Sequence, residues 1–158
     1  MNYRIENKKA MRVVGVRIPL SYEKDEDMIA VPNFWSTILV SDTYRQLCAM
    51  SATEYLYGVT DSTDKNTSYY YICVETKEKT PFNMHELILP VTQRVIFENN
   101  GRFKESVQKT FKRFLLEWLP FSHYEYEGSP DIEVYPINAE KNKEGHSEIW
   151  IAIKEEKE

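Results

Sequence analysis

The chain has 158 residues, 42% hydrophobic and 28% charged, so it is long enough for one globular domain with its own core. Its formal net charge is −5 and it has no long Lys/Arg stripe, which disfavours direct nucleic-acid binding. No run of 18 apolar residues is present, and the N-terminus lacks the apolar segment of a signal peptide. We therefore expect a cytoplasmic protein without membrane association.

The cysteines and histidines do not predict a metal site. Cys48 and Cys73 lie far apart and match no metal-ligand spacing, and two cysteines in such a chain are typical of reduced thiols, although a disulfide stays open. His85, His123 and His146 are scattered, and none pairs with Cys or Asp at ligand spacing. Because a glycine-rich phosphate-binding loop is also missing, we expect no metal and no cofactor.

The first half of the chain predicts a strand, a helix and two further strands. Residues 11–18 are rich in Val, as strands are. A polar, acidic loop over 21–27 precedes a helix that opens at Val31 and Pro32, with residues 43–49 as a short continuation. Two strands are predicted over 54–60 and 68–76, with a turn-rich segment over 61–67 between them and a loop over 77–82 after them.

The second half repeats this order. A strand is predicted over 90–98, and residues 102–119 form the clearest helix, because aromatic and aliphatic residues recur there at three- and four-residue steps until Pro120. Residues 124–128 are expected to be a loop. Strands over 131–136 and 147–154 flank a polar turn over 138–145.

Two β-α-β-β units therefore follow each other, with matching strands 77 to 79 positions apart. Short connections between neighbouring strands favour antiparallel pairing. We predict an α+β fold in which the two units place their sheets edge to edge, with helices on one side. The other face is then left for a ligand groove.

Strand 131–136 has two different faces, because side chains alternate along a strand. Ile132 and Val134 point one way, whereas Asp131, Glu133 and Tyr135 point the other way. A carboxylate among aromatic rings suits an organic cation, so Glu133 and Tyr135 are candidate ligand-binding residues. The alternative is that Glu133 belongs to a face that is open to water.

Other strands are expected to add aromatic walls to the same site. By the same alternation, Tyr57, Tyr69, Tyr71 and Trp150 lie opposite aliphatic positions of their strands and are candidate ligand-binding residues. Tyr69 and Tyr71 are equally compatible with ordinary half-buried sheet positions. Trp35 is a candidate for the pocket rim, although its helix face favours core packing.

An ordered set of short motifs resembles a known family. The motifs are YGV at 57–59, YYYI at 69–72, VIF at 95–97 ahead of a glycine-led helix, WLP at 118–120, DIEVY at 131–135 and EIWI at 148–151. Together they resemble the GyrI-like domain, also called the bacterial transcription-activator effector-binding domain. The resemblance extends from about Arg12 to Ile153.

The resemblance implies a saddle of two β-α-β-β units with a central pocket. In such domains a glutamate of the D-x-E-x-Y strand pairs with cationic aromatic compounds, and Glu133 holds that position here, with Tyr135 beside it. The regulators of this family carry a helix-turn-helix domain ahead of the sensor. Residues 1–158 are therefore expected to form one stand-alone domain without a DNA-binding part, which acts as a sensor or a sequestering protein.

Two other functions stay open. The family also includes hydrolases of reactive cyclopropane-containing compounds, for which Glu133 would transfer protons together with Tyr135 or Tyr71. It also includes gyrase inhibitors, so gyrase or a transcription regulator is a further candidate partner. The sequence leaves the ligand and the oligomeric state undetermined.

Overall fold

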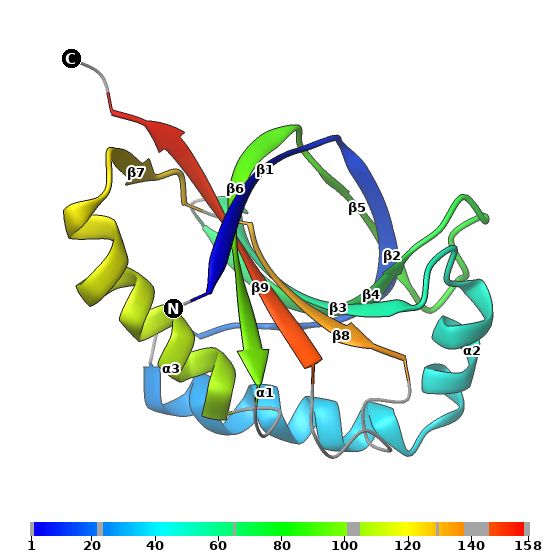
Figure 1. The fold of residues 1–158 in the computed structure, drawn as a ribbon. Helices are drawn as coiled ribbons and strands as arrows, with labels where there is room; N and C mark the ends of the chain where they lie inside the picture. The colour runs from blue at the N-terminus through cyan, green and yellow to red at the C-terminus, as the bar shows by residue number, and fades with distance from the viewer. Residues whose placement is uncertain are drawn as a thin grey trace.

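The computed structural model describes residues 2–21, 24–64, 66–100, 105–128, 130–137 and 146–156. In this part of the chain, nine strands form one sheet that curls into a half-barrel, and helices lie along its outer side (Figure 1). The helices are α1 (Lys24–Leu39), α2 (Asp42–Met50) and α3 (Glu105–Arg113). The strands are β1 (Tyr3–Lys8), β2 (Met11–Pro19), β3 (Tyr55–Asp64), β4 (Thr67–Glu75), β5 (His85–Leu89), β6 (Thr92–Asn100), β7 (Tyr124–Tyr126), β8 (Asp131–Pro136) and β9 (His146–Glu155).

The strand order confirms the predicted duplication. The sheet runs β1-β6-β9-β8-β3-β4-β2-β5, with β7 added beside β9, and every pairing between described strands is antiparallel. The unit β2-α1-β3-β4 therefore corresponds to β6-α3-β8-β9. The two units join edge to edge through β3 and β8, so residues of this pair lie at the centre of the sheet.

Three strands were not predicted. The strands β1 and β5 extend the two ends of the sheet, where β1 pairs with β6 and β5 pairs with β2, and β7 replaces part of the expected loop 124–128. Polar residues dominate β1, so its sequence lacks the alternation typical of a half-buried strand. Its hydrogen bonds come from a strand almost ninety positions away, which no local pattern reveals.

The helix boundaries also differ from the predictions. Helix α1 begins at Lys24 and contains Pro32 in its interior, so part of the expected acidic loop is its first turn. Acidic residues are favourable there because the N-terminal end of a helix carries partial positive charge. The predicted helix 102–119 is α3, followed by a π-helical turn over Phe114–Trp118 and a 3₁₀ turn over Leu119–Phe121. The predicted turn 138–145 lies outside the described residues.

Apolar side chains pack on both faces of the sheet. On the outer face, the α1 cluster includes Trp35, Leu47, Ile72 and Tyr135, and the α3 cluster includes Phe97, Phe114, Ile149 and Ile151. On the concave side, the inner cluster includes Val13, Tyr57, Val59, Tyr71, Ile132 and Val134. The face that was expected to be only a groove is therefore largely filled by its own side chains.

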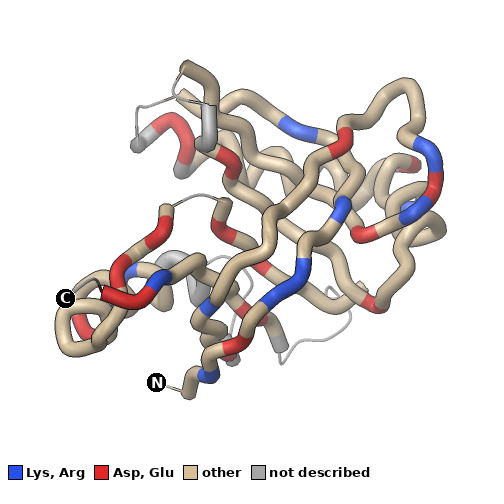
Figure 2. Tube along the Cα trace, turned by 90° about the horizontal axis from the view of Figure 1, so that it is seen from above, with Lys and Arg blue, Asp and Glu red and all other residues tan. Residues whose placement is uncertain are grey.

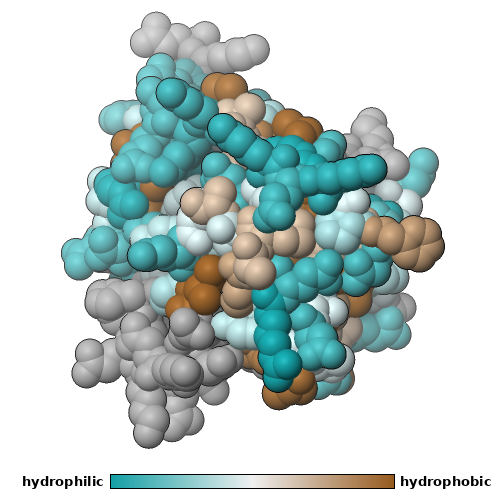
Figure 3. All heavy atoms as spheres, turned by 90° about the vertical axis from the view of Figure 1, so that its right-hand side faces the viewer, coloured by the Kyte–Doolittle hydropathy of each residue, from teal (hydrophilic) through white to brown (hydrophobic). Residues whose placement is uncertain are grey.

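The face on the α2 side carries hydrophobic residues in small groups between hydrophilic ones (Figure 3). Single exposed apolar side chains of this kind are normal on a protein surface. Among the described residues, no helix is both long enough and apolar enough to cross a bilayer.

Candidate functional site

Glu133 lies on the central strand β8, between its partner strands β3 and β9. Gly58 of β3 and Ile149 of β9 are its register neighbours, and all three positions belong to the helix-covered outer face. The α1 cluster with Tyr135 lies on one side of Glu133, and the α3 cluster with Ile149 lies on the other. The half-buried carboxylate therefore occupies the boundary between the two structural repeats.

Two tyrosine hydroxyls hold this carboxylate. Glu133 Oε1 accepts hydrogen bonds from Tyr70 Oη at 2.9 Å and from Tyr135 Oη at 2.6 Å. Trp35 of α1 donates from Nε1 to Tyr70 Oη at 2.8 Å, and its ring meets Tyr135 edge-on with centroids 5.2 Å apart. A continuous hydrogen-bonded chain thus runs from the helix through Tyr70 to Glu133.

Gly58 makes this arrangement sterically feasible. A Cβ atom at this position would overlap the Tyr70 hydroxyl and lie 3.2 Å from Glu133 Oε1. Glycine inside a strand often marks such a close approach of another group. Because Gly58 has no side chain, the Tyr70 hydroxyl occupies the space next to this position of β3.

The environment favours the neutral form of Glu133. Desolvation by burial raises its pKa to about 7, and the charge of Asp131 adds to this effect, while the hydrogen bonds from Tyr135 and Tyr70 oppose it. No Lys, Arg or His forms an ion pair with Glu133 among the described residues. The site is therefore a hydrogen-bonded carboxyl group without a counter-ion, surrounded by aromatic rings.

Four of the predicted ligand-binding residues lie on the other face of the sheet. Tyr57, Tyr69, Tyr71 and Trp150 point to the concave side, so the expectation that they share a face with Glu133 is wrong. The reason is the register between the strands. Glu133 pairs with Gly58 and not with Tyr57 on β3, and it pairs with Ile149 and not with Trp150 on β9. Their role in ligand binding stays a prediction, as does that of Glu133.

Tyr70, whose hydroxyl reaches Glu133 as that of Tyr135 does, was not among the predicted ligand-binding residues. Tyr70 is 3% exposed and shares the α1 cluster with Trp35, which is 1% exposed. Trp35 is therefore a core residue, as the helix face on which it lies predicted, and it does not line an open pocket rim. It also donates a hydrogen bond to the Tyr70 hydroxyl. The isolated glycine in strand 54–60 was the signal that a neighbouring side chain approaches there.

The concave aromatic residues already contact cations of the chain itself. The Arg17 guanidinium lies over the Tyr69 ring at 3.8 Å and donates to Tyr71 Oη at 3.0 Å. The Lys8 ammonium lies over the Trp150 ring at 4.3 Å. An external cation on the concave face would therefore have to compete with these interactions.

Neither Cys48 nor Cys73 is in a disulfide, and burial raises the pKa of the Cys73 thiol well above its ordinary value. The described residues contain no group of three or more His, Cys, Asp or Glu side chains that could hold a metal ion.

Several solved structures share this fold at low sequence identity. SAV2435 bound to tetraphenylphosphonium has a TM-score of 0.84 at 15% identity, over 98% of this chain and 94% of that one. A putative transcription regulation protein from Staphylococcus aureus MU50 has a TM-score of 0.79 at 16% identity, over 98% and 99% of the two chains. The EcmrR C-terminal domain has a TM-score of 0.63 at 13% identity, over 98% of both chains.

These likenesses show a shared fold, and no curated protein matches the sequence. The sequence itself, however, matches the family model described as GyrI-like small molecule binding domain over residues 1–154, which is nearly the whole chain. The chain belongs to the GyrI-like small molecule binding domain family.

Proposed function

We propose that this protein binds small lipophilic cations, with Glu133 as the residue that recognises the positive charge. The observation that carries this proposal is the half-buried carboxyl group, which two tyrosine hydroxyls hold and no described cation neutralises. A buried carboxylate without a counter-ion is costly, so a bound cation would relieve that cost. A cationic ligand would provide the positive charge that the described residues do not place beside Glu133.

The surroundings of Glu133 suit an aromatic or lipophilic body around that charge. Rings of Tyr70, Tyr135 and Trp35 are within the same cluster, and a cation over such a ring gains about 0.5–2 kcal/mol. Binding of tetraphenylphosphonium by the structural relative SAV2435 supports the same ligand class. We infer a role as a sensor domain of the type found in transcription regulators, or as a protein that sequesters such compounds.

The first test is a calorimetric titration of the purified protein with tetraphenylphosphonium. Glu133→Gln keeps the size of the side chain and removes its charge, so we expect the affinity to fall at least tenfold, or about 1.4 kcal/mol. Glu125→Gln is the matched control, because Glu125 is an exposed carboxylate on β7. In the wild type the affinity should rise between pH 5.5 and 8, since the cation requires the ionised carboxyl whose pKa is about 7.

Equal affinity of the wild type and a folded Glu133→Gln variant would contradict the role of Glu133. A pH dependence that persists unchanged in that variant would also contradict it. Loss of affinity in Glu125→Gln would point to general surface electrostatics instead of a specific carboxyl site.

A second candidate function is hydrolysis of a reactive electrophile. It is favoured by the pKa of about 7 for Glu133, because a general acid or base works best when its pKa is close to the working pH. Tyr135 would be the proton partner, whereas Tyr71 is on the opposite face and donates no hydrogen bond to Glu133. Cyclopropane-type compounds should then be consumed at a rate proportional to protein concentration, and Glu133→Gln should stop this. No consumption by wild type would argue against a hydrolase.

A further inference from the structure

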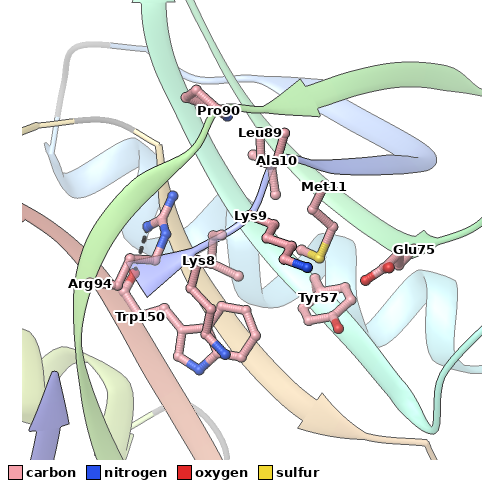
Figure 4. A pocket seen from close by; sticks show the side chains of 11 residues that line it. Lys8, Lys9, Ala10, Met11, Tyr57, Glu75, Leu89, Pro90, Arg94 and Trp150 are labelled. Atoms are coloured by element: carbon pink, nitrogen blue, oxygen red, sulfur yellow. Dashed lines mark hydrogen bonds between the residues drawn. The ribbon is translucent and has the colours of Figure 1, made fainter. Parts of the chain in front are cut away.

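A cavity on the concave side of the sheet differs from the Glu133 site in both position and charge. It has a volume of about 210 Å³ and opens beside the segment that joins β1 to β2 (Figure 4). Its apolar wall comprises Met11, Tyr57, Leu89, Ile132 and Trp150. Ile132 directly precedes Glu133 on β8, so the cavity and the carboxyl lie on opposite faces of the same strand.

The charged groups around this cavity are mostly positive. Lys8, Lys9 and Arg94 line it, against the single carboxylate of Glu75. Figure 2, which shows the molecule from above, shows Lys and Arg recurring along the chain where β1 passes into β2. Positive potential in a concave site attracts anions and repels cations.

Arg94 is the most unusual of these residues. Its side chain is 1% exposed, and Nη1 donates to the carbonyl oxygens of Pro130 at 3.0 Å and Trp150 at 3.2 Å. Nη2 has no hydrogen-bond partner among the described residues, and neither has Asp131 Oδ1. Asp131 attracts Arg94 electrostatically, but its other oxygen accepts from Tyr126. Buried guanidinium groups normally have all their donors satisfied. Nη2 of Arg94 is therefore an unsatisfied buried donor of a residue that lines the cavity.

We infer that the concave cavity is a second ligand site, and that it binds small aromatic carboxylates. The carboxylate would accept a hydrogen bond from Arg94 Nη2 and be attracted by Lys8 and Lys9, while the ring would lie against the apolar wall. Arg suits a carboxylate because its donors are fixed in a plane. The cavity is smaller than the roughly 300–1,000 Å³ of drug-sized sites, so one small ring system is the size class that it accommodates.

The test compares three ligands that share a ring and differ in charge: 2-naphthoate, 2-naphthamide and 2-naphthylmethylammonium. Each is titrated calorimetrically into the full chain at low salt. We expect the affinity of naphthoate to fall as salt is added. The charge comparison is made in Glu133→Gln, in which the proposed cation site is lost, and there naphthoate should bind at least tenfold more tightly than the ammonium compound. An ammonium compound that binds Glu133→Gln as well as naphthoate does overturns the inference.

Two variants with matched controls assign the site. Arg94→Met should weaken naphthoate binding at least tenfold, whereas Arg45→Met, at an exposed arginine of α2, should not change it. The double substitution of the half-buried Lys8 and the exposed Lys9 by Gln should weaken naphthoate binding severalfold and flatten its salt dependence. The double substitution of the exposed Lys77 and Lys79 by Gln should not. Circular dichroism checks folding.

Unchanged naphthoate affinity in a folded Arg94→Met variant overturns the inference, since Arg94 is then only a structural ion balanced by Asp131. If Arg94→Met does not fold, the pair at Lys8 and Lys9 decides, and unchanged affinity there overturns the inference. Tetraphenylphosphonium reports separately on Glu133. If tetraphenylphosphonium binds and naphthoate does not, this inference fails and the proposed cation site stands. If naphthoate binds and tetraphenylphosphonium does not, the proposed cation site fails and this inference stands.

Discussion

Two opposing effects set the protonation of Glu133. Burial disfavours the charged carboxylate, while the hydroxyls of Tyr70 and Tyr135 donate to it and favour it. Because burial is the larger effect, the pKa rises to about 7. If Glu133 binds a cation as proposed, the nearby positive charge would lower its pKa again and favour the ionised form.

The Tyr70 hydroxyl can lie beside Glu133 because Gly58 has no side chain. We expect Gly58→Ala to destabilise the protein by about 1–3 kcal/mol, as overpacking does, because the new methyl group overlaps the Tyr70 hydroxyl. Urea denaturation measures this cost. The same substitution in a Tyr70→Phe background should cost less, because the overlapping atom is gone. An equal cost in both backgrounds would show that the hydroxyl is not the source of the strain.

Strand alternation separates the aromatic residues into two environments. On the outer face, Tyr70 and Tyr135 turn their hydroxyls toward a carboxyl group. On the concave face, Tyr69 and Tyr71 contact the Arg17 guanidinium from the neighbouring strand β2. Tyr69 and Tyr70 are adjacent in sequence, yet Tyr69 contacts a guanidinium group and Tyr70 donates to a carboxyl group. This is because each strand of the curled sheet has one side toward the helices and one side toward the cavity.

The strand pair β3–β8 places the candidate cation site at the join between the repeats. Gly58 and Glu133 face each other across this pair, with one helix cluster on each side. The outer strand β1 precedes β2 in the chain but pairs with β6, and β5 precedes β6 in the chain but pairs with β2. If β1 and β5 are counted with the repeats that they precede, three strand pairings link the two repeats.

At the scale of the whole molecule, the buried carboxyl groups make stability depend on pH. Burial raises the pKa of Glu133 from 4.5 to about 7 and that of Asp131 from 3.8 to about 6. The folded state therefore holds these protons more tightly than the unfolded state does. The resulting stabilisation is complete below about pH 4 and is lost as the pH rises through 6 and 7.

We expect the free energy of unfolding to fall by about 1–3 kcal/mol between pH 5.5 and pH 8 because of these groups. Urea denaturation at the two pH values measures the difference. Glu133→Gln should have a smaller pH dependence, since its amide does not titrate, and Glu125→Gln should match the wild type. A wild-type protein that becomes more stable as the pH rises over this range would contradict the pKa shift of Glu133.

The repeated fold was largely predictable, and the ends of the sheet were not. Residues 11–18, 68–76 and 131–136 have apolar patterns strong enough to identify strands locally, and the order of elements revealed the duplication. The strands β1 and β5 have few buried side chains. Pairing with distant strands stabilises them, so their own sequences contain little indication of structure.

The sequence by itself determined that Glu133 and Tyr135 share a face, because alternation along one strand is a local property. It also determined the family, through an ordered set of short motifs. Only the tertiary structure decided that Tyr70 joins Glu133 while Tyr57, Tyr71 and Trp150 lie on the other face. Faces of different strands are related by register, and a shift of one residue exchanges them. Register arises from hydrogen bonds and packing between segments that are far apart in the chain.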